Sequence, residues 1–186
     1  MPDVLVPLAN GCEELEAVTI IDLLRRAGID VTTASLEEGT IVASRGTRLV
    51  ADCTLEQARS RTYDMIALPG GLPGADHLRD DHRVIDIIRD AASAGKYVSA
   101  ICAAPKVLIK AGVLEGKKAT FYPGALTERE LATITPTDEA VVVDGRVITS
   151  KGPGTAMDFA LTLIELLAGR GRRDQVEEAL QRPDSG

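Results

Sequence analysis

Short apolar runs alternate with amphipathic runs along this chain, and this alternation is the feature that most limits how the chain can fold. Residues 3–8, 30–35 and 63–68 have the length and the apolar, partly β-branched character of buried strands. Helical spacing is found over residues 13–27, 80–94, 155–168 and 170–181. A further helical run in the middle of the chain ends at about residue 111. Short strands separated by helices predict an α/β fold with a doubly wound, mostly parallel sheet and helices on both of its faces.

Two stretches interrupt the alternation and are predicted to be hairpin-like. Glycines divide residues 40–51 into short strands, and Asp144-Gly145 separates expected strands over 139–143 and 146–150. Asp-Gly between two such runs is a strong signal for a hairpin turn. With 186 residues, of which 45% are hydrophobic, the chain is expected to form a single domain over 1–186 that ends in a charged helix and tail from about 170.

The overall charge and the cysteine pattern exclude several classes of function. The 28 acidic residues outnumber the 21 basic ones, and aromatic residues make up 3% of the chain, so nucleic acid is not an expected partner. The N-terminus does not read as a signal peptide, and no apolar run approaches the roughly 18 residues that span a membrane; a cytoplasmic protein is expected. Cys12, Cys53 and Cys102 have no disulfide or metal-ligand spacing, so we expect reduced thiols, no metal and no cofactor.

Cys102 is the strongest candidate for a reactive side chain. It follows the strand-like run that begins at Tyr97 and precedes a helix that is expected to start near Pro105. A cysteine at such a strand-to-helix elbow would leave the sheet beside free backbone N–H groups, which are expected to lower its pKa. The alternative is a small buried hydrophobic residue at the end of a strand, which is common for cysteine.

Two further features of the chain point to the same edge of the sheet. Gly70-Gly71 follows the strand over 63–68 and lacks the spacing of a nucleotide-binding loop, so it is either a structural turn or a backbone segment that approaches a reacting atom. Glu16 falls among Ile20, Leu23 and Ala27 on the helical wheel, which predicts a buried carboxyl group. Such a group has a raised pKa and can relay protons near neutral pH, or it can be a satisfied structural carboxyl group.

Other titratable residues are given structural interpretations. Glu13 and Glu14 are placed in the first turn of a helix, where acids complement the helix dipole. His77 and His82 lie among charged residues of a surface helix, and a solvated role is expected for both. Without a nearby histidine, an amidohydrolase or protease reading is the least favoured, because amide cleavage needs a base and an acid.

Six segments, taken together and in order, resemble the ThiJ/PfpI superfamily. They are NGCEELEAV at 10–18, IDLLRRAG at 21–28, SRG at 44–46, LPGG at 68–71, AICAAP at 100–105 and TSKGPGT at 149–155. The segments are most similar to the DJ-1 branch, which includes the parkinsonism-associated protein deglycase and bacterial-type members. The resemblance extends over about residues 3–168 and implies a flavodoxin-like α/β sandwich that forms a homodimer through the first helix and neighbouring segments.

The resemblance also assigns roles to residues of this chain. It implies an easily oxidised nucleophile at Cys102, a protonated partner at Glu16 and backbone donors at Gly71 and Ala103. It further implies a pocket, or an anion-binding surface near the dimer interface, that involves Gly70, Arg26, Arg45, Tyr122, Gly152 and Pro153. Tyr122 stands where many relatives have a histidine; a tyrosine can donate a hydrogen bond but is a poor general base at neutral pH.

The resemblance implies a cysteine-dependent, glutathione-independent enzyme for small α-oxoaldehydes. Conversion of methylglyoxal to lactate, or removal of its early adducts from proteins, is the expected chemistry, with a role in carbonyl and oxidative stress. The alternative from a different class is a redox sensor or stress-protective protein in which Cys102 is oxidised to the sulfinate.

Overall fold

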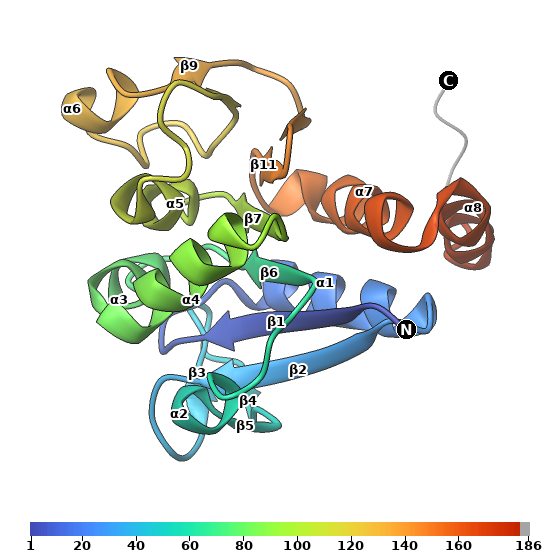
Figure 1. Cartoon of the computed structure of the whole chain (residues 1–186). Coiled ribbons are helices and arrows are strands. Elements are labelled where there is room, and N and C mark those ends of the chain that lie inside the picture. Colours follow the sequence, from blue (N-terminus) through green and yellow to red (C-terminus); the bar gives the residue numbers. More distant parts are fainter. Residues whose placement is uncertain (183–186) are drawn as a thin grey trace.

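The computed structural model describes residues 1–182, and its centre is a seven-stranded sheet. The strand order is β10-β11-β7-β6-β1-β2-β5, and every neighbouring pair is parallel except β10 and β11. The strands are β1 (Asp3–Leu8), β2 (Asp30–Ser35), β5 (Cys53–Thr54), β6 (Met65–Leu68), β7 (Tyr97–Ile101), β10 (Val141–Asp144) and β11 (Val147–Ser150). The doubly wound, mostly parallel sheet predicted from the alternation is confirmed (Figure 1).

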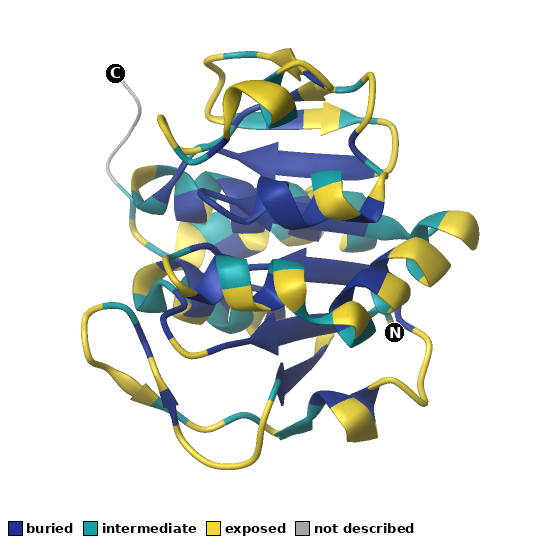
Figure 2. Cartoon of the chain, turned by 90° about the vertical axis from the view of Figure 1, so that its left-hand side faces the viewer, coloured by how far each residue is buried: buried dark blue, intermediate teal, exposed yellow. Residues whose placement is uncertain are grey.

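Helices cover both faces of the sheet and form two hydrophobic cores with it. One core lies under α1 (Glu14–Arg26), α7 (Ala156–Ala168) and α8 (Arg170–Ala179). The other core lies under α2 (Leu55–Ala58), α3 (Gly74–Asp80), α4 (His82–Ser93) and α5 (Pro105–Ala111). Figure 2 shows buried strands between helices whose outward faces are exposed, which is the usual pattern when both faces of a parallel sheet are covered.

The remaining elements lie outside the main sheet. β3 (Ile41–Val42) and β4 (Arg48–Leu49) form the antiparallel excursion expected within residues 40–51. The expected Asp-Gly hairpin is formed by β10 and β11. β8 (Lys118–Ala119), α6 (Glu128–Leu131), β9 (Thr135–Pro136) and the 3-10 turn η1 (Pro153–Thr155) have no counterpart in the sequence prediction. The charged C-terminal helix is α8, and the end of the expected tail, 183–186, lies outside the described residues.

The predicted start of the helix over 80–94 is wrong, because α3 ends and α4 begins at this point. Asp81 has an extended backbone, with φ −84° and ψ 112°, so it ends α3 and caps α4. Its side chain accepts a hydrogen bond of 2.9 Å from the backbone N–H of Arg83. A capping aspartate is a standard start for a helix, and here it also marks the end of a short helix that periodicity alone did not indicate.

The strand order reverses beside β1, and this position determines where a site can form. The chain runs from β1 to β2 and β5 on one side, and then crosses to β6, β7 and β11 on the other. Loops at the carboxyl ends of strands diverge at such a reversal, which leaves room for a ligand. The loop after β6 and the elbow after β7 both lie at this edge.

Candidate active site

Cys102 is held at the elbow by its backbone. It has φ 64°, in the left-handed region that is uncommon for a residue other than glycine. Its backbone N–H donates to the Ser150 carbonyl at 2.9 Å, and its own carbonyl accepts from the Tyr122 N–H at 2.9 Å. Strained positions of this kind persist where the surrounding structure holds them in place, and they are concentrated at functional sites. The neighbouring strand and loop therefore fix the direction in which the thiol points.

Glu16 reaches the same place from the first turn of α1. The residue is 0% exposed, which confirms the burial predicted from the helical wheel. Its Oε2 accepts a 2.8 Å hydrogen bond from the backbone N–H of Gly70, and its carboxyl group interacts with the Cys102 side chain. Among the described residues, the buried Oε1 has no hydrogen-bond partner of ordinary geometry. The carboxyl group thus has one oxygen satisfied by the backbone and one that is available beside the thiol.

The two glycines after β6 are required by close packing. A Cβ on Gly70 would lie 2.7 Å from the Cys102 Cβ and 2.8 Å from Glu16 Oε2. Gly71 has φ +88°, and a Cβ there would collide with the backbone at Cys12 and Glu13. The backbone N–H groups of Gly71 and Ala103 lie close to the Cys102 sulfur. For Gly70-Gly71 the sequence left two interpretations, a structural turn or a backbone segment that approaches a reacting atom. The structure favours the second, because this backbone lies against the Cys102 side chain.

The ionisation of the Cys102–Glu16 pair differs from the sequence expectation. Burial raises the pKa of Cys102 to about 12, the nearby Glu16 carboxylate adds to this, and the Gly71 and Ala103 N–H groups oppose it. The expectation that the helix start lowers this pKa is therefore wrong, because desolvation and a neighbouring negative charge outweigh the N–H dipoles.

The pKa of the Glu16 carboxyl group is raised for the same reason as that of the Cys102 thiol. Burial raises the pKa of Glu16 to about 7, while the hydrogen bonds from Gly70 and Cys102 oppose the shift. Two adjacent buried negative charges are unfavourable, so the pair holds one proton over a wide range of pH and titrates as a unit. When the carboxyl group carries that proton, the thiolate faces two backbone donors and no opposing charge.

A cavity of about 340 Å³ opens above Cys102. Its lining includes Gly71, Ala103, Arg45, Tyr122 and Pro153, all of which the resemblance had assigned to the site. Gly152 lies directly behind Tyr122, because a Cβ on Gly152 would be 3.1 Å from the tyrosine ring. Gly70 lies beneath Cys102. These residues are brought together from five separate segments of the chain.

Arg26 does not line this cavity. It lies in the last turn of α1, ten residues after Glu16, which corresponds to about 15 Å along the helix axis. Its guanidinium group forms an ion pair of 2.6 Å with Asp22, one turn earlier on the same exposed face. Arg26 of the same chain therefore does not reach the cavity, and its implied role at an anion-binding surface near a dimer interface stays a prediction.

Glu14 has a role that the sequence analysis missed. Its carboxylate accepts hydrogen bonds from the Ser44 hydroxyl and from the backbone N–H groups of Arg45 and Thr47, at 3.0–3.3 Å. Burial alone would raise its pKa, but these N–H donors, together with its own, outweigh burial and hold the pKa at about 2. Glu14 thus fixes the turn that brings Arg45 to the cavity, and only the contact between distant segments reveals it.

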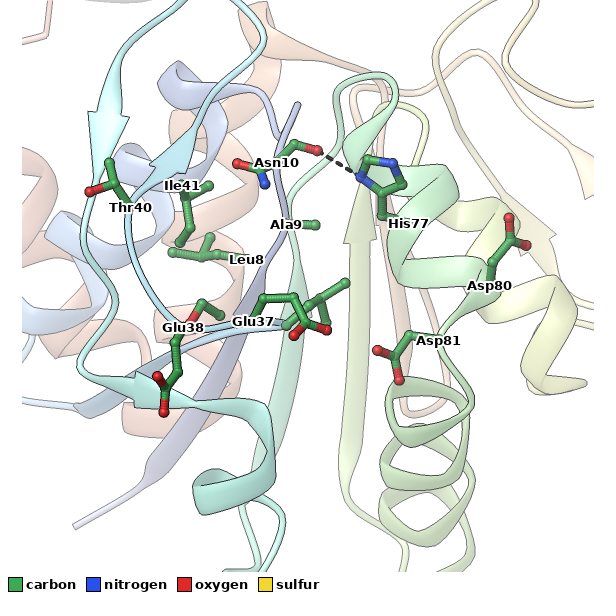
Figure 3. Close-up of a pocket in the computed structure, with 12 residues that line it drawn as sticks. Leu8, Ala9, Asn10, Glu37, Glu38, Thr40, Ile41, His77, Asp80 and Asp81 are labelled. Carbon is green, nitrogen blue, oxygen red and sulfur yellow. Dashed lines mark hydrogen bonds between the residues drawn. The ribbon is translucent and has the colours of Figure 1, made fainter.

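Neither histidine belongs to the Cys102 cavity. His77 lines a different cavity of about 420 Å³ at the carboxyl ends of β1 and β2, where its Nδ1 lies 3.0 Å from the Asn10 carbonyl (Figure 3). His82 lines a third cavity, between α3, α4 and α5. The amidohydrolase alternative therefore lacks a histidine base at the thiol.

Residues 1–182 also bear on metal binding and on membrane crossing. No group of three or more histidine, cysteine or acidic side chains is placed to hold a metal ion in this part of the chain. None of the helices described there combines the length and apolar character that crossing a membrane requires.

The fold agrees with comparisons to known proteins. The chain belongs to the DJ-1/PfpI family, whose profile matches residues 2–166. It is 44% identical over 177 residues to the Drosophila melanogaster protein dj-1beta, which is 95% of each chain. The crystal structure of Drosophila DJ-1beta matches with a TM-score of 0.93 at 42% identity over 98% of both chains, and it confirms the flavodoxin-like fold.

Two further relatives define the range of the similarity. The Arabidopsis thaliana protein DJ-1 homolog A is 42% identical over 186 residues, which is 98% of this chain and 47% of that protein. This chain therefore spans about half the length of the Arabidopsis relatives that it matches. A Caenorhabditis elegans protein named glutathione-independent glyoxalase DJR-1.2 is 34% identical over 162 residues, which is 86% of this chain and 85% of that protein.

Proposed function

We propose that this protein converts small 2-oxoaldehydes such as methylglyoxal into 2-hydroxy acids without glutathione. The observation that carries the proposal is the fully buried Glu16 carboxyl group beside Cys102, with one oxygen that has no other partner. The similarity to a relative named as a glutathione-independent glyoxalase supports the same reaction class. Cys102 would act as the nucleophile and Glu16 as the proton carrier.

The single proton of the pair suits the first step of this reaction. Glu16 takes the proton of the Cys102 thiol, and the resulting thiolate adds to the aldehyde carbon, so that a sulfur–carbon bond forms and the carbonyl electron pair moves to oxygen. Glu16 gives its proton to that oxygen, which produces a hemithioacetal and leaves a carboxylate. Once the sulfur is bonded to carbon, the N–H groups of Gly71 and Ala103 are available to stabilise the developing oxyanion.

The second half of the reaction uses the carboxylate that the first half creates. Glu16 removes the proton from the former aldehyde carbon, which gives an enediolate, and returns a proton to the adjacent carbon. The hydroxyl proton on the former aldehyde oxygen passes to the adjacent oxygen, so that two electrons move within the substrate. The product is a thioester of the 2-hydroxy acid, and no external oxidant is needed. Water then cleaves the thioester, which releases lactate from methylglyoxal and regenerates the thiol.

The direct test supplies methylglyoxal without glutathione and follows lactate by chiral chromatography. Cys102→Ala is expected to lower lactate formation by at least about a thousandfold, since the covalent step is removed. Cys53→Ala is the matched control, because Cys53 is a half-buried thiol in the short edge strand β5. Full activity of Cys102→Ala would disprove the mechanism.

Removal of early aldehyde adducts from protein thiols and amines is a finer form of the same proposal. It requires the adduct itself, rather than free aldehyde released from it, to reach Cys102. A preformed adduct whose loss accelerates with enzyme concentration beyond its spontaneous dissociation rate would support this activity. A loss rate that stays at the dissociation limit would assign all turnover to free aldehyde.

A redox role for Cys102 is favoured by the donors around its sulfur. The N–H groups of Gly71 and Ala103 and a protonated Glu16 would each bind an oxygen of a sulfinate. Mild peroxide would then add two oxygens at Cys102, observed by intact mass and peptide mapping. A stable sulfinate together with negligible aldehyde turnover would favour sensing over catalysis.

We also propose a homodimer that forms through the outer face of α1. Leu15 is 51% exposed and Val18 is 46% exposed on that face, although both are apolar. An apolar helix face is expected to be covered by a partner. Light scattering of the wild-type chain should give twice the 19.7 kDa chain mass, and Val18→Glu should return it to one chain mass. A monomeric wild type would disprove the dimer.

A further inference from the structure

The cavity above Cys102 has an apolar side that the conversion of methylglyoxal does not need. Apolar residues line one side together with Tyr122, namely Leu72, Pro123, Ala125 and Pro153, whereas Glu13, Ser44 and Arg45 form its polar side. Leu72 is 53% exposed and Tyr122 is 50% exposed, so two large apolar surfaces stand open at the mouth. At about 340 Å³, the cavity falls in the range of small-molecule sites and is much larger than a substrate with five heavy atoms requires.

Tyr122 is held in position by contacts on three sides. Its N–H donates to the Cys102 carbonyl at 2.9 Å, and its carbonyl accepts from the Ala125 N–H at 3.0 Å. Its ring lies against Gly152, where a Cβ would approach to 3.1 Å. The backbone of Tyr122 is therefore held beside the elbow that carries the thiol, the ring forms one wall of the cavity, and Gly152 is the residue that leaves room for it.

We infer that the cavity selects 2-oxoaldehydes that carry an apolar or aromatic group, with Tyr122 and Leu72 as the specificity-determining residues. The inference rests on the proposed function, because the aldehyde carbon must reach Cys102. The side group then lies against the tyrosine ring and the leucine, and its removal from water adds binding free energy. Methylglyoxal has a single methyl group to offer to this surface, so it uses only a small part of it.

The first experiment compares phenylglyoxal with methylglyoxal in the wild type and in variants of the wall. The ratio of their kcat/KM values is expected to favour phenylglyoxal in the wild type and to fall about tenfold in Tyr122→Ala, the factor that one aromatic pair supports. Tyr122→Phe keeps the ring and should keep the ratio. Leu72→Ala and Gly152→Ala should each lower it by about threefold, the first by removing apolar surface and the second by displacing the ring.

The second experiment needs no turnover and therefore separates the two proposals. Cys102 is alkylated with iodoacetamide or with N-phenyl iodoacetamide, and the two rates are measured by mass spectrometry relative to a small free thiol. A preference for the phenyl reagent that is lost in Tyr122→Ala supports the apolar wall, even if no aldehyde is converted and the proposed function fails. Equal ratios in the wild type, Tyr122→Ala and Leu72→Ala in this assay would overturn the inference.

Discussion

Glu14 and Glu16 lie two residues apart in the first turn of α1, but they point into two regions with opposite effects on a carboxyl group. The region around Glu14 offers several N–H and hydroxyl donors from the turn at residues 44–47 and holds its pKa at about 2. The region around Glu16 removes water and offers one backbone donor, so its pKa rises to about 7. Burial together with the number of donors, and not the position along the helix, decides which acid is a structural anchor and which can move a proton.

Replacing each acid by its amide is the strongest way to test this comparison. Glu16→Gln keeps the shape and can keep the Gly70 hydrogen bond, but it cannot exchange a proton with the substrate. Lactate formation is expected to fall by about 10²- to 10⁴-fold, the usual range for loss of a general acid–base group. Glu14→Gln, on the same helical turn, is the matched control and should lose much less, because it acts through the position of Arg45. Equal losses in the two variants would contradict the division of roles.

The contributions of Glu16 and Glu14 to folding stability should change with pH in opposite directions. The folded protein keeps a proton on Glu16 between its ordinary pKa of 4.5 and about 7, so the contribution of Glu16 is present below pH 4.5 and is lost as the pH rises through 7. Glu14 is the reverse: its contribution is present above pH 4.5 and is lost as the pH falls toward 2.

Urea unfolding from pH 3 to 8 measures these two contributions. For Glu16 the shift of pKa corresponds to about 3 kcal/mol across the window. Relative to the wild type, Glu16→Gln should therefore gain stability as the pH rises from 4.5 to 8. Glu14→Gln should lose its disadvantage as the pH falls. Parallel curves for the wild type and both variants would show that the two carboxyl groups do not differ as described.

Most of the fold could be predicted because its elements depend on local pattern. The strand at 3–8 and the hairpin at Asp144-Gly145 match the structure, since apolar runs and turn residues act within a few positions. β8, α6 and β9 were missed because each has four residues or fewer and is supported by contacts rather than by periodicity. The boundary at Asp81 was missed because one capping side chain, and not a change of pattern, separates α3 from α4.

In the candidate site, too, features that depend on local pattern could be predicted, and features that depend on contacts between distant residues could not. The burial of Glu16 follows from the helical wheel, and the elbow at Cys102 follows from the order of strand and helix. The direction of the Cys102 pKa could not be predicted, because it depends on burial of the thiol and on the charge of a residue 86 positions earlier that the fold brings beside it. The contact of Glu14 with the Arg45 turn has the same origin.

The smallest expected effect comes from weakening the contact between Glu14 and the turn at residues 44–47. In Glu14→Gln, one amide oxygen replaces two carboxylate oxygens that accept from Arg45, Thr47 and Ser44, so at least one of these donors loses its acceptor. A cost of about 1–2 kcal/mol in unfolding free energy is expected at pH 7, since a hydrogen bond to a charged group is exchanged for a weaker one. Hydrogen exchange should accelerate at the Arg45 and Thr47 amides and stay unchanged at Gly70, which donates to Glu16. Faster exchange at Gly70 as well would mean that the two sides of the helix turn are one cooperative unit, and the comparison between them would no longer hold.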